Sequence, residues 1–212
     1  MNDRPDHDRS AWHAAVSWQR LDGESRVNYL RVAVITILYV IHSVDYFTAV
    51  TPHLGVFGDA ADYHFAITLL AGAGLMIGLM VELALRSRWF PRWFAAATTV
   101  ADIGLLTSVL SIAGGQRSPS VTLYCLVPVL ATLRFEPWLV RMATALSTMG
   151  YLWLGCVGWF TAGRGLPSPP HADGTSQTIV AMSIVAIGLV ASRWVRRSEI
   201  VANDFARRCA DG

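Results

Sequence analysis

The amino-acid sequence predicts an all-α polytopic membrane protein, a bundle of six transmembrane helices with both termini in the cytoplasm. Three observations support this fold class. Apolar residues make up 53% of the 212 residues and charged residues only 15%, against about 25% charged in soluble domains. The apolar residues gather in six segments, and the basic residues alternate between the connections on the two sides of those segments.

Each apolar segment approaches the length of about 20 residues that a helix needs to cross a hydrocarbon core of about 30 Å. The fourth and the sixth are short, and we expect flanking polar residues to snorkel or the bilayer to thin there. An alternative joins the fourth and fifth segments as a re-entrant pair, but two charges and a proline within residues 134–137 favour a turn at the interface. In chain order the segments are Val32–Val50, Phe65–Leu85, Phe94–Ala113, Val121–Leu133, Met142–Ala162 and Thr178–Ser192.

The arginines orient the chain, since all 17 basic residues are arginine. Fifteen of them lie in or beside the N-terminal segment, the second and fourth connections and the C-terminal segment, and only Arg117 and Arg164 lie in the other connections. This alternation follows the positive-inside rule for a chain that crosses the membrane six times. It predicts a multi-pass protein with both termini in the cytoplasm (N-in/C-in).

The segments divide the chain into a cytoplasmic N-terminal segment (1–29), a transmembrane domain (30–193) and a cytoplasmic C-terminal helix (194–212). Four residues of that last helix follow a 4-3-4 spacing: Trp194, Ser198, Val201 and Phe205. The spacing predicts either a dimer seam or an interfacial helix whose arginines contact anionic lipid. The three cysteines are an odd number and fit neither a disulfide framework nor a zinc site.

Polar residues inside the apolar segments are costly in a bilayer and mark candidate sites. His42 and Asp45 lie three residues apart and share a helical face, while Asp102 lies near the middle of the third segment. They predict either a polar pocket for a ligand, a proton or a quinone headgroup, or a self-satisfied His42–Asp45 pair with Asp102 hydrogen-bonded to a neighbouring helix. Counting depth at about 1.5 Å per residue puts His42 and Asp102 at similar levels. We therefore expect Asp102 to face the first helix, with His42 as its partner.

Two further patterns concern helix packing. Glu82 and Arg86 lie four residues apart and predict an ion pair near the interface. Gly74 and Gly78, also four apart, predict a face against which a neighbouring helix packs closely. A further alternative for the outer side is a haem or metal site that uses two of three histidines, His42, His53 and His64.

The connection between the third and fourth segments carries the most informative short motif. Gly114 and Gly115 permit positive φ and a very tight reversal. Ser118 can cap a helix whose first residue is Pro119, and the N–H groups of such a terminus suit a carbonyl or an anion. These four residues are therefore candidate ligand-binding residues at the outer surface. Pro128 is expected to kink the following helix.

This motif, Gly-Gly-x-x-Ser-Pro before an apolar helix with a mid-helix proline, resembles the six-span sensor regions of bacterial histidine kinases. It is similar to the motif of the redox-responsive global sensor kinases of photosynthetic proteobacteria, in which the version ending Asn-Pro-Phe is tied to ubiquinone sensing. Ser118 stands here where those kinases have Asn, and Ser120 where they have Phe. The resemblance extends over the six-span layout and implies a sensor of the bacterial cytoplasmic (inner) membrane, with quinone as a possible ligand.

No kinase, cyclase or other catalytic motif follows the last apolar segment, so we expect no enzyme. The expected function is a stand-alone sensory or signalling membrane module, resembling the input half of a six-span histidine kinase without an output domain. It would lie in the lipid bilayer, act with a second copy or with a separate kinase or response partner, and bind no nucleic acid. The alternatives are an accessory or scaffold subunit of a membrane complex, and a small membrane enzyme or transporter that uses His42, Asp45 and Asp102.

Overall fold

The computed structural model describes residues 4–48, 60–87, 91–134, 136–162 and 173–211, and every regular element within these ranges is a helix. The all-α prediction is therefore confirmed for the described part of the chain. The elements are α1 (Arg4–Thr48), α2 (Ala60–Arg86), α3 (Arg92–Ile112), the 3-10 helices η1 (Gly115–Arg117) and η2 (Pro119–Thr122), α4 (Leu123–Thr132), α5 (Pro137–Ala162) and α6 (Gly174–Asp211).

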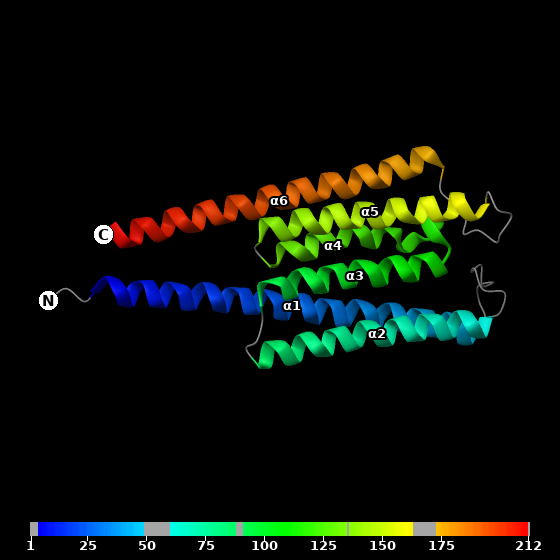
Figure 1. Cartoon of the computed structure of the whole chain (residues 1–212), viewed down its shortest axis with the longest axis horizontal. Helices are drawn as coiled ribbons and strands as arrows, with labels where there is room; N and C mark the ends of the chain where they lie inside the picture. Colours follow the sequence, from blue (N-terminus) through cyan, green and yellow to red (C-terminus); the bar gives the residue numbers. More distant parts are fainter. Residues whose placement is uncertain (1–3, 49–59, 88–90, 135, 163–172, 212) are drawn as a thin grey trace.

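The helices lie side by side with their long axes roughly aligned (Figure 1). α1 packs on α2, while α5 packs on α3, α4 and α6. Both chain ends lie at the same end of the bundle, where α1 and α6 extend well beyond the other helices (Figure 1). We call this the terminus end, and we call the opposite end, where α3 runs into η1, the loop end.

Four of the described helices are long and apolar enough to cross a membrane, and they correspond to the first, second, third and sixth predicted segments. The fourth predicted segment lies in a shorter apolar stretch, Pro119–Thr132. The fifth lies in α5, which has 26 residues. The structure thus supports a membrane protein with several spanning helices, and six crossings stay a prediction. The four long apolar stretches are Asp22–Thr48, Ala61–Arg86, Trp93–Ile112 and Gly174–Ser198.

The first helix is longer than predicted, because the chain is already helical before its apolar stretch begins. α1 begins at Arg4 rather than near Val32, so most of the predicted N-terminal segment continues the same helix. α6 runs to Asp211, so the predicted C-terminal helix continues the last apolar segment without a break. α1 and α6 thus each connect the bundle to the terminus end as one unbroken helix.

The surface of the bundle is unusually apolar, and several charged side chains lie in its mostly apolar interior. Large apolar side chains such as Phe47, Met80 and Trp153 are exposed on the bundle surface, where a soluble monomer rarely carries extensive apolar patches. Charged side chains such as Glu24 and Arg134 are buried. This arrangement is expected where lipid, rather than water, surrounds the helices.

The predicted close-packing face on α2 is confirmed. Gly74 and Gly78 both face α1, and a Cβ added at Gly74 would lie 2.7 Å from Cδ1 of Ile35. Two helices approach this closely only where one of them has a glycine or another very small residue at the contact. The predicted ion pair on the same helix is also present, with Nε of Arg86 3.0 Å from Oε1 of Glu82.

Replacing Gly78 with leucine should lower the stability of the bundle by about 1–3 kcal/mol, the usual cost of overpacking a core. A Cβ at this position would lie 2.9 Å from Cγ2 of Val32. Gly72→Leu on the same helix is the matched control, since nothing lies within 4 Å of a Cβ there. Thermal unfolding midpoints in one detergent compare the two variants. Equal losses would show that packing against α1 is not the cause.

The connection from α3 to α4 makes the tight turn that the sequence predicts. The φ angles of Gly114 and Gly115 are 100° and 65°, a region that residues with a side chain avoid. The Ser118 side chain accepts a hydrogen bond from a backbone N–H two residues on, at 3.4 Å, and Pro119 begins η2. Pro128 lies inside α4 and is buried.

Candidate functional site

A cavity of about 650 Å³ lies between α1, α2, α3 and α4, and the connection from α3 to α4 lines its loop end. Most of its wall is formed by apolar side chains, among them Leu38, Leu70 and Leu106. Gly114 and Gly115 shape the turn without lining the cavity. The other five predicted site residues all line it: His42, Asp45, Asp102, Ser118 and Pro119.

Histidine and tyrosine side chains gather at the loop end of this cavity. Nε2 of His42 lies 3.2 Å from Nδ1 of His64, so one imidazole donates a hydrogen bond to the other. The Tyr46 ring stacks on His64 with ring centroids 4.1 Å apart. Tyr63 lies edge-on to His42 and lines the cavity together with Asp45. This end therefore presents imidazole, phenol and carboxylate groups to a space whose wall is mostly apolar.

The histidine geometry does not match the haem alternative. Two axial histidines hold a haem iron between them, whereas His42 and His64 stack on each other and share a hydrogen bond. Within the described ranges, no group of three or more His, Cys, Asp or Glu side chains is placed to hold a metal ion. His53 lies outside the described residues. The predicted pairing of His42 with Asp45 stays a prediction.

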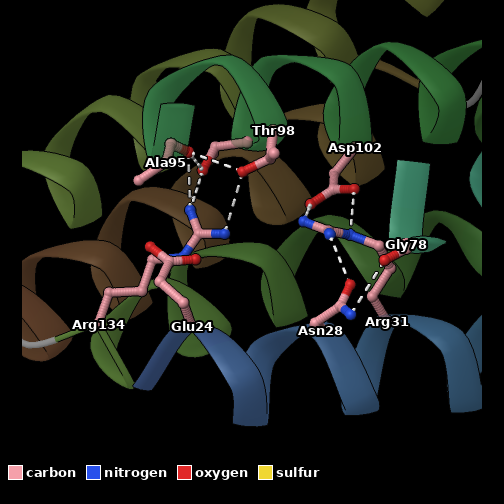
Figure 2. A network of polar contacts seen from close by, with 9 residues as sticks. Glu24, Asn28, Arg31, Gly78, Ala95, Thr98, Asp102 and Arg134 are labelled. Atoms are coloured by element: carbon pink, nitrogen blue, oxygen red, sulfur yellow. Dashed lines mark hydrogen bonds and ion pairs between the residues drawn. The ribbon is translucent and has the colours of Figure 1, made fainter. Parts of the chain in front are cut away.

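Asp102 lies toward the terminus end of the cavity and faces α1, as predicted, but the predicted partner is wrong. Both of its carboxylate oxygens accept hydrogen bonds from Arg31, from Nε and Nη2 at 2.7 Å each (Figure 2), and not from His42. Nη1 of Arg31 also donates to Oδ1 of Asn28 at 3.2 Å. The Asn28 amide in turn donates to the carbonyl oxygen of Gly78 at 3.1 Å. This network joins α1 to both α2 and α3.

The correction has a physical reason. The depth count began the first helix near Val32 and so placed Arg31 at the membrane surface. In the structure α1 is helical long before Val32, and the Arg31 side chain is only 5% exposed inside the bundle. A buried guanidinium is best compensated by an opposite charge with matching hydrogen bonds, and the partly buried Asp102 carboxylate, 27% exposed, supplies both. The two groups pair in two-pronged geometry, which a single imidazole cannot offer to the carboxylate.

A second buried ion pair lies nearer the terminus end (Figure 2). Nε of Arg134 lies 3.1 Å from Oε2 of Glu24, and the two side chains are only 3% and 2% exposed. Arg134 also donates to the carbonyl oxygen of Ala95 at 2.9 Å and to the hydroxyl oxygens of Thr99 and Thr98 at 2.6 and 3.2 Å. Burial lowers the pKa of the Arg134 guanidinium, and the Glu24 carboxylate opposes this by raising it.

Sequence reasoning missed this pair, because it assigned Arg134 to an interfacial turn and Glu24 to a polar segment outside the membrane. The one signal that could have indicated it is Gly23. A Cβ at Gly23 would lie 2.5 Å from the carbonyl oxygen of Leu133. The absence of a side chain therefore lets α1 approach the turn after α4, and this approach brings Glu24 beside Arg134.

A further polar contact, also missed, ties the α3–α4 connection to α5 and α6. Gln116 is buried, and its Nε2 donates to the carbonyl oxygen of Tyr151 on α5 at 3.1 Å. Its Oε1 accepts a hydrogen bond from Nε2 of Gln177, near the start of α6, at 2.6 Å. The loop end of the cavity is thus linked to the first turns of α6.

No family model, curated protein or solved structure matches this chain. A fold alone does not specify a function, so the cavity and its contacts are the features of this chain that bear on what it does. The resemblance to histidine-kinase sensor regions accordingly remains an expectation drawn from the motif that ends in Ser118 and Pro119.

Proposed function

We propose that this chain is a sensory module of a bacterial inner membrane, in which a quinone binds in the cavity between α1, α2, α3 and α4. One observation carries the proposal. A single cavity of about 650 Å³ gathers polar residues that the sequence scatters over the first helix, the third helix and a connecting loop. Sites for small ligands are typically concave and mostly apolar, with a few polar groups that fix orientation.

The lining suits a molecule with a polar ring and an apolar tail. At the loop end, His42, Tyr63 and Ser118 carry N–H and O–H groups that can donate hydrogen bonds to the carbonyl oxygens of a quinone. Between the two ends the wall is apolar, which favours burial of an isoprenoid tail. We therefore place the quinone ring at the loop end and its tail along α1 and α3.

The proposal includes six membrane crossings with both termini in the cytoplasm. Both chain ends lie at one end of the bundle (Figure 1), as an even number of crossings requires. The arginine bias favours the cytoplasm for that end. A reporter active only in the periplasm, fused after Gly212, should be silent, and activity of that fusion would overturn the orientation.

The quinone would act by changing how α1 and α6 pack. α1 lines the cavity from Val27 to Asp45 and continues unbroken to the terminus end. The connection from α3 to α4, which lines the loop end of the cavity, contacts α6 through a hydrogen bond between Gln116 and Gln177. A ligand that binds one arrangement of these helices more tightly shifts the population toward it. The extensions of α1 and α6 are where a second copy, or a separate kinase or response partner, would detect the shift.

The experiment measures binding of a tritiated, short-tailed ubiquinone analogue to the purified protein in lipid nanodiscs. Ala71→Trp introduces a large side chain into the cavity wall and should weaken binding by roughly tenfold or more, which is about 1.4 kcal/mol. Ala97→Trp is the matched control, since Ala97 is exposed on α3 and does not line the cavity. Gly115→Val and Pro119→Ala, which alter the turn, should also weaken binding.

Two results would contradict the proposal. The first is that the wild-type protein shows no saturable binding of the analogue. The second is that Ala71→Trp and Ala97→Trp bind it equally well. Loss of binding in Ala71→Trp without any effect of the two turn variants would instead confine the site to the helices and leave the turn as a connection only.

A further inference from the structure

A second hollow, separate from the cavity, lies between α4 and α6. It is a groove of about 600 Å³ lined mostly by apolar residues, among them Val129 of α4, Leu133 directly after it, and Ile187 and Val190 of α6. The cavity described above uses a different set of α4 residues, on another face of that helix. The groove is therefore independent of the proposed quinone site.

The groove is open to the surroundings of the bundle. Val129 and Val190 are 45% and 62% exposed, and Trp194, which lines its terminus end, is 77% exposed. Tryptophan is enriched at the level of lipid headgroups, where its ring is partly apolar and its N–H is polar. This position indicates that the groove begins in the apolar part of the bilayer and ends near the headgroups.

Basic side chains lie beside the terminus end of the groove. Arg193 and Arg197 lie three and seven residues after Val190, so the helical period places them on the same side of α6 as that lining residue. Both are exposed, and neither lines the groove itself. Residues 193–199 contain three arginines and one glutamate, so this part of α6 carries a net positive charge. The apolar groove is thus flanked by basic side chains at the level of Trp194 and Ser198, its last lining residues.

We propose that this groove binds an anionic phospholipid. One acyl chain would lie along α4 and α6, and the phosphate would contact Arg193 and Arg197. Basic pockets at the membrane surface between transmembrane helices recognise anionic headgroups, and each basic residue near the surface contributes about 1 kcal/mol. A zwitterionic lipid has the same acyl chains but no net charge, so it fits the groove without this electrostatic gain.

Native mass spectrometry of the detergent-purified chain, given equal amounts of phosphatidylglycerol and phosphatidylcholine, tests this site. The wild-type protein should retain phosphatidylglycerol with a preference of roughly tenfold, and Arg193→Gln/Arg197→Gln should abolish the preference. Arg196→Gln is the control: it removes one positive charge from another face of α6, against two in the double variant, and should preserve the preference. Ala186→Phe, which fills the groove, should reduce retention, whereas Ala145→Phe on an exposed part of α5 should not.

Equal retention of the two lipids by the wild-type protein would overturn the proposal, as would a loss of preference in Arg196→Gln that matches the double variant. Circular dichroism of each variant verifies that it is folded before its lipid binding is compared. A dimer that lacks lipid preference and dissociates in Ala186→Phe would assign the groove to a second copy of the chain instead.

Discussion

Replacing Arg134 with methionine should destabilise the folded bundle by about 3–5 kcal/mol, the range seen when one partner of a buried ion pair is removed. The substitution keeps an apolar side chain at the position but leaves Glu24, only 2% exposed, without its counter-charge. It also removes the hydrogen-bond donors to the carbonyl oxygen of Ala95 and to the hydroxyl groups of Thr98 and Thr99. Equilibrium denaturation in mixed micelles measures the loss.

A double variant distinguishes the unpaired charge from lost packing. Glu24→Leu/Arg134→Met should recover much of the loss, because replacing a whole buried ion pair by apolar residues is often close to neutral. Arg134→Lys should fall between the wild type and Arg134→Met, since it keeps the charge but not the planar fork of donors. A double variant as unstable as Arg134→Met would mean that the unpaired Glu24 carboxylate is not the cause.

Replacing Asp102 with leucine should produce the second-largest effect, a destabilisation of about 3 kcal/mol or more. It leaves the guanidinium of Arg31, which is 5% exposed, without the carboxylate that accepts two of its hydrogen bonds. Asp102→Asn should insert normally and lose less stability, but it should alter signalling because it weakens the contact between α1 and α3. The same denaturation assay, together with binding of the ubiquinone analogue, compares the two variants.

The control for this pair is Arg31→Met/Asp102→Leu, which should be more stable than Asp102→Leu alone. Asp102→Leu without any change in stability or quinone binding would show that the carboxylate faces lipid or headgroups rather than α1. That result would also show that the Arg31–Asp102 ion pair does not couple the cavity to α1, the helix that extends to the terminus end.

The sequence predicted the helices well because apolar length and capping are properties of neighbours along the chain. The predicted third segment, Phe94–Ala113, lies within two residues of α3 at each end. The sequence also predicted the turn at Gly114 and Gly115 and the close-packing pair Gly74 and Gly78. Both predictions were correct, because paired glycines typically mark either a backbone with positive φ or a close approach of two helices. The predicted extent of the first helix was too short, since hydropathy ends where the membrane ends and a helix need not.

The candidate site was predicted in its residues but not in its contacts. His42, Asp45, Asp102, Ser118 and Pro119 were singled out because polar groups are costly in an apolar segment and because a turn needs particular residues. That all five line one cavity could not be derived, since it depends on how far each helix is rotated about its own axis.

By itself the sequence determined that this chain is helical and apolar enough for a membrane, where its main helices lie, and which polar residues deserved attention. Only the tertiary structure decided which of them meet. Arg31 and Asp102 are 71 residues apart in the chain, and Glu24 reaches Arg134 because Gly23 lets α1 approach the turn after α4. Such pairings are set by the rotation and axial offset of whole helices. Those two quantities come from packing over the entire bundle, and no local pattern of residues encodes them.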